Sequence, residues 1–158
     1  LHLSIRRQRQ MCIRDRTSDG NWVPAEGKAL RALLALLHED GVNAADISVI
    51  TPFKNVLENL KRLLGDTMVS GTIHTMQGKE APVVIMVLGG NTDGPGARDW
   101  AVSEPNLLNV AATRAKRRFY VIGDRNDWQN RALFCDVMDL LPLQRLPEHE
   151  AVAMTQPQ

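Results

Sequence analysis

Arg114 is the first residue whose type and position suggest chemistry. Apolar residues recur at i, i+3, i+4 and i+7 from Leu108 to Ala115, and this spacing of one buried face predicts a helix over Glu104–Ala115. At about 100° per residue, Arg114 falls on the border of that face, where a permanent cation can reach out of a cleft while its stem stays packed. The alternative is a solvated basic turn between this helix and an apolar strand over Phe119–Ile122.

A second group of polar side chains lies in the stretch Gly71–Glu80, between two apolar runs. This stretch holds more hydrogen-bonding side chains than a simple connection needs. No second histidine or cysteine stands at metal-ligand spacing, so we predict no metal site. A lone histidine in a loop is, as the alternative, more often a surface or capping residue. The polar residues are Thr72, His74, Thr75, Gln77 and Glu80.

Apolar runs alternate with amphipathic helical patterns through most of the chain. This alternation predicts an α/β fold in which a parallel β-sheet is sandwiched by helices. Ligands of such sheets sit outside the carboxyl ends of the strands, and the first strand delivers Thr51, Pro52 and Phe53 to that edge. The predicted strands are Ile47–Ile50, Met68–Ile73, Val83–Leu88 and Phe119–Ile122, and the predicted helices are one from Pro24 that ends at Gly41, Phe53–Leu64 and Asp127–Leu141.

The composition is that of one soluble globular domain, with 158 residues, of which 44% are hydrophobic and 23% charged. Residues 1–16 hold five arginines and one acid, so residues 17–158 hold 14 basic and 17 acidic residues, a net charge of −3. A global basic field for nucleic acid is therefore absent, and any binding must come from a local patch. The two cysteines lack metal or redox spacing, and no apolar run is long enough to span a membrane, so we predict a cytoplasmic protein without membrane contact.

The two ends of the chain look unlike its body. Residues 1–16 show neither helical nor strand periodicity and resemble translated sequencing adapter, so we expect a non-native or disordered leader; the alternative is a basic arm that touches nucleic acid. Residues 17–141 are predicted to form the domain, and residues 142–158 a flexible tail. Because the first residue is Leu1 and not methionine, we expect the chain to be a piece of a longer protein.

The residues Asn109–Lys116, NVAATRAK, closely resemble motif VI of superfamily 1 helicases, whose usual form is N-V-A-[LVS]-[ST]-R-A-[KR]. The resemblance implies that Arg114 is an arginine finger, which inserts against the nucleotide γ-phosphate from the second RecA-like domain. Such a finger is worth about 10³–10⁵ in rate, because a planar, always protonated guanidinium matches the charge that spreads over the phosphoryl oxygens. It also implies that Asn109 and Thr113 belong to the nucleic-acid-binding surface.

The residues Gly71–Glu80, GTIHTMQGKE, resemble motif V of the same superfamily, T-[VI]-[HD]-x-[FM]-Q-G-x-E. The resemblance implies a nucleotide-facing part, in which a glycine lets a backbone N–H approach a phosphate, and a part that lines the nucleic-acid channel. The nucleotide-facing residues are Gln77, Gly78, Lys79 and Glu80. The channel residues are Thr72, His74 and Thr75.

The stretch ISVITPFK resembles the motif IV region of Upf-like helicases, which implies nucleic-acid contacts for Thr51, Pro52 and Phe53. Two positions depart from the family pattern. Asn55 stands near the place where relatives have a glutamine, and Pro82 stands where the family usually has an acid, so a backbone donor and a carboxylate are missing at the start of the next strand.

The three stretches occur in family order, which favours the C-terminal RecA-like motor domain of a Upf-like superfamily 1 helicase. The chain contains neither a G-x-x-x-x-G-K-[ST] loop nor a strand that ends in Asp-Glu, so ATP and Mg²⁺ should be bound mainly by an N-terminal RecA-like domain of the same protein. The other expected partner is single-stranded DNA or RNA. Alone, the chain should neither hydrolyse ATP nor unwind a duplex. The alternatives are a non-catalytic RecA-like module that binds nucleic acid or a partner, and a nucleotide-binding enzyme of another kind.

Overall fold

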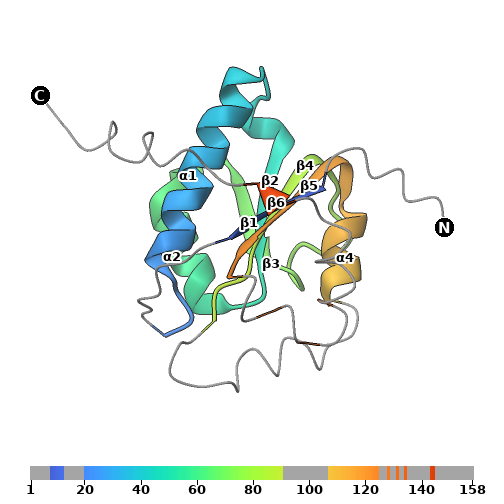
Figure 1. Ribbon diagram of the computed structural model, residues 1–158. Coiled ribbons are helices and arrows are strands. Elements are labelled where there is room, and N and C mark those ends of the chain that lie inside the picture. The colour runs from blue at the N-terminus through green and yellow to red at the C-terminus, as the bar shows by residue number, and fades with distance from the viewer. Residues whose placement is uncertain are drawn as a thin grey trace, which may run out of the picture.

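A computed structural model of the chain describes residues 8–12, 20–90, 107–124, 128, 131, 134 and 143–144. Its strands form one six-stranded sheet, in the order β3-β2-β4-β5-β1-β6, and every neighbouring pair is parallel (Figure 1). The predicted α/β fold with a parallel sheet is confirmed. The strands are β1 (Gln8–Cys12), β2 (Ile47–Thr51), β3 (Val69–Thr72), β4 (Ala81–Val87), β5 (Ala115–Gly123) and β6 (Leu143–Gln144); the helices are α1 (Pro24–Glu39), α2 (Lys54–Leu64) and α4 (Leu107–Thr113), with short 3-10 turns at Ala44–Asp46 and Gly65–Thr67.

Helices cover both faces of the sheet, with α1 and α2 on one face and α4 on the other (Figure 1). The chain passes from β1 to β2 to β3 in one direction across the sheet and then turns back to β4 and β5. Right-handed crossovers place connections of opposite direction on opposite faces of a parallel sheet, which explains the two helical layers.

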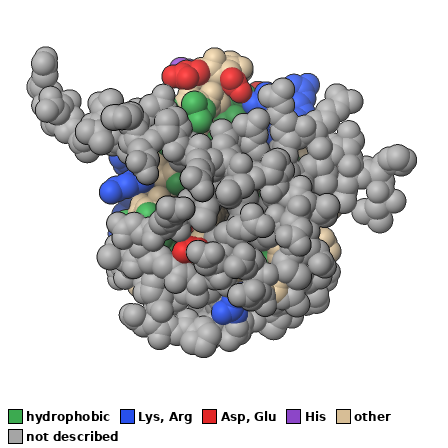
Figure 2. Space-filling view, in the orientation of Figure 1, with side chains coloured by type: hydrophobic (Ala, Val, Ile, Leu, Met, Phe, Trp, Pro, Cys, Tyr) green, Lys and Arg blue, Asp and Glu red, His purple; other side chains and the backbone are tan. Residues whose placement is uncertain are grey.

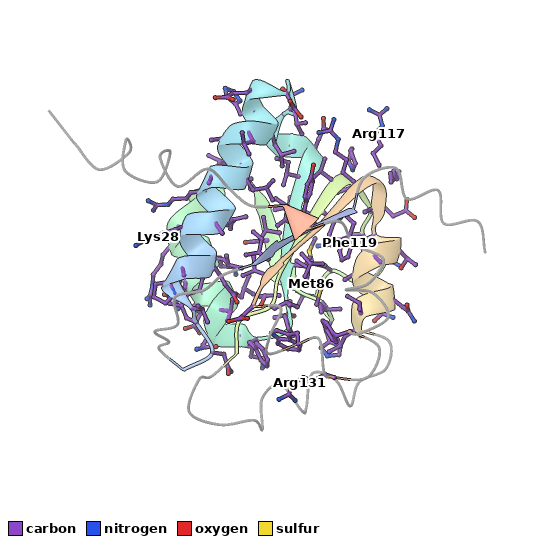
Figure 3. The ribbon with its side chains drawn as sticks, in the orientation of Figure 1. Lys28, Met86, Arg117, Phe119 and Arg131 are labelled. Atoms are coloured by element: carbon purple, nitrogen blue, oxygen red, sulfur yellow. The ribbon has the colours of Figure 1, made fainter. Side chains whose placement is uncertain are left out.

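The core is built on the neighbouring strands β2 and β4. All five residues of β2 are buried, and so are all residues of β4 except Pro82. Met86 and Phe119 are 0% and 2% exposed and lie in the interior of Figure 3, whereas Lys28 and Arg117 point outward. The apolar stripe of α1 packs onto this sheet through Leu30, Leu33 and Leu37, as its helical spacing predicts.

The strand after α4 is longer than its apolar run suggests, because β5 begins at Ala115 and not at Phe119. The pairing of β4 with β5 shifts register around Pro82, so β5 carries an extra residue there. Proline has no N–H to donate to a sheet, and a bulge is the usual way in which a strand accommodates it. Lys116 and Arg117 therefore belong to the strand, on its exposed first part, and not to a turn before it.

A salt bridge joins the start of β5 to the end of α1. Arg118 Nη1 lies 3.3 Å from Asp40 Oδ2, next to the last residue of α1. Figure 2 shows acidic and basic side chains together at the top of the view, where α1 ends. Arg118 thus has a structural partner in this structure.

The two ends of the chain differ from the expectation. Gln8–Cys12 pairs in parallel with β5, and Leu143–Gln144 pairs with β1, so both segments extend the sheet. The lack of regular structure expected there is wrong for these residues, because backbone pairing with a neighbouring strand does not require an alternating side-chain pattern. The domain boundaries and the non-native origin of residues 1–16 stay predictions.

The last predicted helix, Asp127–Leu141, lies mostly outside the described residues. Within it, Trp128 and Phe134 are 1% and 3% exposed, with ring centroids 4.7 Å apart, as core aromatics are. No helix in the described part of the chain has the length and apolarity to cross a membrane.

Candidate functional site

The segment from Ile73 to Glu80 crosses the sheet between β3 and β4. Ile73 and Met76 anchor it, being 2% and 4% exposed, and Ile73 N donates to Thr51 O at 3.1 Å. A Cβ at Gly71 would lie 2.6 Å from Met76 Cγ, so this glycine makes room for the anchor. Because β3 and β4 are parallel, the segment must run from the carboxyl end of one strand to the amino end of the next. Its first residues therefore lie near the carboxyl ends of the strands, the carboxyl edge of the sheet. Its last residues lie near the amino ends, the amino edge.

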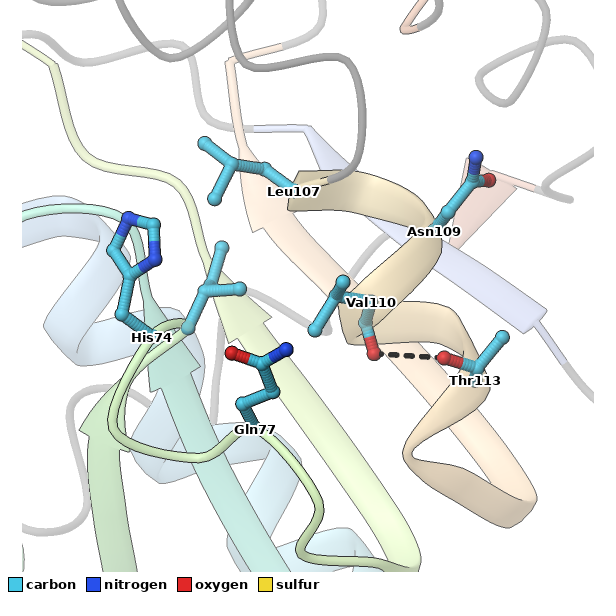
Figure 4. A pocket seen from close by; sticks show the side chains of 7 residues that line it. His74, Gln77, Leu107, Asn109, Val110 and Thr113 are labelled. Carbon is cyan, nitrogen blue, oxygen red and sulfur yellow. Dashed lines mark hydrogen bonds between the residues drawn. The ribbon is translucent and has the colours of Figure 1, made fainter.

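A groove of about 310 Å³ separates this segment from α4 (Figure 4). It has apolar walls and several hydrogen-bonding groups, and none of the described side chains that line it is an acid, a lysine or an arginine. Candidates predicted from two separate stretches of sequence thus come together. The polar lining residues are His74, Gln77, Asn109 and Thr113, and the apolar ones are Ile73, Leu107 and Val110.

Lys79, Glu80 and Arg114 lie at the amino ends of β4 and β5. Ala81 N donates to Arg114 O at 3.0 Å, which fixes the two strand starts side by side. These three residues thus lie at the opposite ends of the strands from Thr51, Pro52 and Phe53, which follow the carboxyl end of β2. The segment after β3 crosses the sheet without a helix, and α4 likewise brings the chain back to the amino edge before β5 starts.

Arg114 follows the last residue of α4 and is half-buried. Its backbone N donates to Ala111 O at 3.2 Å, and its side-chain Nε donates to Val110 O at 3.3 Å. The guanidinium is therefore held at the end of the helix by one nitrogen, while its planar head remains partly open to solvent. Such a tethered, partly exposed cation suits an anionic ligand at the amino ends of the strands.

Gly78 follows Gln77, which lines the groove, and precedes Lys79 and Glu80 at the amino end of β4. Its φ of +83° is in the left-handed region, and no atom lies within 4 Å of the place where a Cβ would stand. An exposed backbone with this geometry lets a phosphate approach closely, which fits the predicted nucleotide-facing role. Across the described residues, no group of three or more His, Cys, Asp or Glu is placed to hold a metal ion.

Glu80 has a partner across the two strand starts. Lys116 Nζ lies 3.2 Å from Glu80 Oε2, and the side chains are 60% and 53% exposed. An ion pair in so much water contributes little to folding, which leaves the carboxylate accessible to a ligand.

Lys116→Ala is accordingly expected to change the free energy of unfolding by less than about 1 kcal/mol, because the pair is more than half exposed. Urea unfolding of the wild-type and variant chains measures this. A loss above about 2 kcal/mol would mean that the pair is a structural element and not an accessible one.

The other predicted residues lie close to the sheet. Thr51 is 0% exposed and its Oγ1 accepts from Phe53 N at 3.4 Å, Phe53 is 6% exposed, and Pro52 is buried. Thr72 is also buried; its Oγ1 donates to the exposed Thr75 Oγ1 at 3.2 Å. These positions shape the turns after β2 and β3, and their contacts with nucleic acid stay predictions.

Glu26 is a residue that reading the sequence missed. It is 2% exposed, and its Oε2 accepts from Gly89 N at 2.7 Å. Its spacing held a signal, because Glu26 stands four residues before Leu30 and so lies on the buried face of α1. An acid on the inward face of a helix needs a buried donor, and the structure supplies it from the end of β4.

Residues 4–126 match the protein family described as AAA domain (AAA_12). The chain belongs to this family. The match starts within residues 1–16 and ends just after β5, so it includes the groove, Arg114 and the whole sheet except β6.

Two curated relatives of this AAA domain are a helicase and a DNA-binding protein. The chain is 36% identical over 94 residues to the DNA polymerase alpha-associated DNA helicase A of Schizosaccharomyces pombe, which covers 57% of this chain and 14% of that protein. It is 29% identical over 130 residues to the DNA-binding protein SMUBP-2 of Rattus norvegicus, which covers 79% of this chain and 13% of that protein. The chain thus spans only about a seventh of these relatives.

A solved structure shares the fold. The C-terminal domain of a possible DNA helicase from Lactobacillus plantarum WCFS1 has a TM-score of 0.52 at 13% identity, over 75% of this chain and 74% of that one. This likeness supports the predicted RecA-like fold, and the family match and the curated relatives agree with the resemblance to superfamily 1 helicases.

Proposed function

We propose that this AAA domain is the C-terminal motor domain of an ATP-dependent superfamily 1 helicase. In the whole protein, ATP would lie between this domain and an N-terminal RecA-like domain that holds most of the nucleotide and its Mg²⁺. This chain would supply Arg114 to the phosphates, and the groove beside α4 to a single strand of DNA or RNA. The observation that carries the proposal is the groove itself, which joins residues of two helicase-like motifs.

The groove suits a single strand because of its chemistry. Amide, hydroxyl and imidazole groups offer hydrogen bonds to phosphate, sugar or base edges, while the apolar walls contributed by Leu107 and Val110 tolerate a flat, uncharged surface. The absence of permanent charge from the described lining favours contacts that hold and orient the strand over contacts that neutralise it. Basic residues for the phosphates would come from elsewhere in the protein.

The amino edge suits the nucleotide. Gln77 and Gly78 lead from the groove to Lys79 and Glu80, and Arg114 lies beside them at the start of β5. A single loop therefore runs from the proposed strand-binding groove to the proposed nucleotide edge. A movement of this loop on ATP binding is a direct physical route by which nucleotide state would alter the grip on the strand.

The second candidate function is a non-catalytic RecA-like module that binds nucleic acid or a partner protein. The exposed salt bridge between Lys116 and Glu80 is the observation that favours it, since it pairs the acid assigned to the nucleotide. The retention of Gln77, Gly78 and Arg114 around the same edge supports the motor domain instead. Turnover of ATP by the protein with both RecA-like domains separates the two functions.

Alanine at His74 or Thr113 is expected to weaken binding of a single-stranded oligonucleotide by about 3–10-fold each in the two-domain protein, the worth of about one hydrogen bond. The slope of affinity against salt should stay unchanged for Thr113→Ala, because a hydroxyl displaces no counterions. Fluorescence anisotropy with DNA and RNA oligonucleotides measures both quantities and compares the two nucleic acids.

Two matched controls lie away from the groove. His38 is an exposed histidine in the last turn of α1, on the other face of the sheet. Thr67 is an exposed threonine whose Oγ1 donates to Leu64 O at 2.8 Å, as Thr113 Oγ1 donates to Val110 O at 3.1 Å. If His38→Ala and Thr67→Ala weaken binding as much as the groove variants do, the groove is not the binding site.

A further inference from the structure

A crevice between the carboxyl ends of β2 and β4 is the place where the topology of this sheet predicts a ligand. β2 and β4 are neighbours, but β2 leads to α2 on one face and β4 leads toward α4 on the other. Two adjacent strands whose connections leave on opposite faces open a crevice, and open parallel sheets bind ligands there. The groove and Arg114 of the proposed function lie elsewhere, so this crevice needs an explanation of its own.

The crevice is filled by the protein's own groups. Glu26 reaches it from the first turn of α1, and its Oε2 accepts from Gly89 N at 2.7 Å. Gly90 N donates to Asn21 O at 2.8 Å, so two successive N–H groups after β4 are bound by the segment around the start of α1. Gly89 and Gly90 have φ values of +63° and +123°, which only glycine adopts easily.

The walls of this crevice are tight. A Cβ on Gly89 would lie 2.6 Å from Asn21 O, 2.7 Å from Val56 Cγ2 and 3.4 Å from Phe53 Cδ2. Glu26 is 2% exposed, and it is the only acidic or basic side chain among the buried described residues. Burying a carboxylate costs several kcal/mol unless donors compensate it, so its retention in such a place needs a specific interaction.

Backbone N–H groups of glycines in a left-handed conformation are a common cradle for oxyanions. In this chain, the oxyanion on Gly89 N is the Glu26 carboxylate. We propose that the crevice at the end of β4 is an oxyanion site whose ligand is built in, the Glu26 carboxylate, and that it accepts a small free carboxylate when this side chain is removed. One consequence rests on the proposed function: because Glu26 occupies Gly89 N, this amide does not bind nucleotide phosphates, and among the described residues the amino edge, where Arg114 lies, remains for them.

The test is replacement of the missing carboxylate by acetate. Glu26→Ala removes the same number of heavy atoms as acetate contains, so the anion fits the space left beside Gly89 N. Acetate at about 100 mM should raise the Tm of Glu26→Ala by about 3–5 °C over sodium chloride of equal ionic strength, for a site of about 10 mM affinity. The wild-type chain and Glu39→Ala, an exposed acid on the same helix, should shift by less than about 1 °C.

Acetamide separates the charge from the shape, because it has nearly the same size as acetate and no charge. It should raise the Tm of Glu26→Ala by less than half as much as acetate does. An equal effect of acetate on Glu26→Ala and Glu39→Ala, or of acetamide and acetate on Glu26→Ala, would overturn the proposal.

A measurement on the wild-type chain covers the case in which Glu26→Ala does not fold. Amide hydrogen exchange at Gly89 should be as slow as at Leu88, whose N donates to Ile122 O at 2.9 Å within the sheet. Exchange of the Gly89 amide at the rate of an exposed loop would overturn the proposal. These experiments need neither ATP nor nucleic acid, so their failure leaves the motor-domain proposal standing, and the converse also holds.

Discussion

Arg114→Ala, in the protein that contains both RecA-like domains, is expected to lower the nucleic-acid-stimulated turnover of ATP by about 10³–10⁵-fold. The half-buried side chain is tethered through Nε to Val110 O at the end of α4, with the rest of the guanidinium at the amino edge of the sheet. If a phosphate chain binds there, loss of the planar cation removes the group that matches charge developing on the transferred phosphoryl oxygens. Steady-state ATPase assays with saturating single-stranded nucleic acid measure the loss.

Two further variants sharpen this test. Arg114→Lys keeps the charge but loses the planar fork, so it should recover only part of the turnover. Arg117→Ala removes an exposed cation from the same basic stretch and should retain nearly full turnover. Wild-type turnover in Arg114→Ala would show that this residue is not the arginine finger, and equal losses in Arg114→Ala and Arg117→Ala would point to general basicity of the edge.

Gly89→Ala is expected to destabilise the chain by about 3–5 kcal/mol, the sum of a left-handed backbone penalty and of overpacking. Its φ is +63°, and the new Cβ would meet Asn21 O, a backbone atom that cannot move aside cheaply, at 2.6 Å. Urea unfolding followed by circular dichroism measures the free-energy difference. A shift of the Asn21 backbone would also disturb its hydrogen bond with Gly90 N, which should add to the loss of stability.

Gly41→Ala is the matched control for this variant. Its φ is +79°, equally unfavourable for alanine, but no atom lies within 4 Å of the place where its Cβ would stand. It should therefore cost only about 1–2 kcal/mol, the backbone penalty alone. Equal losses of unfolding free energy in Gly89→Ala and Gly41→Ala would mean that the crevice at the end of β4 accommodates a methyl group without overpacking.

Local patterns were enough to predict most of the regular structure. The apolar run that became β4 and the helical spacing that became α2 depend on residues close together in sequence, and both were predicted to within a few residues. The same holds for the buried stripe of α1. Such elements are readable because the buried face repeats with the period of the element itself.

The spacing of apolar residues did not predict strands that form through backbone pairing with a distant segment. The exposed first part of β5 has no apolar pattern, yet it is a strand because Ala81 and Ala115 pair across the sheet. Gln8–Cys12 likewise owes its strand to β5. Pairing between segments far apart in sequence leaves no periodic signal in either of them.

The sequence by itself determined which residues of this protein have candidate chemistry: His74, Gln77 and Arg114 stood out by their types and positions, and the resemblance to helicase motifs added Asn109 and Thr113. Only the tertiary structure decided where they meet: four of them along one groove, and Arg114 at the amino edge and not the carboxyl edge. It also decided that Glu26 binds Gly89, 63 residues away. The physical reason is that sheet order and crossover direction, which set these meetings, arise from packing between distant segments and not from any local pattern.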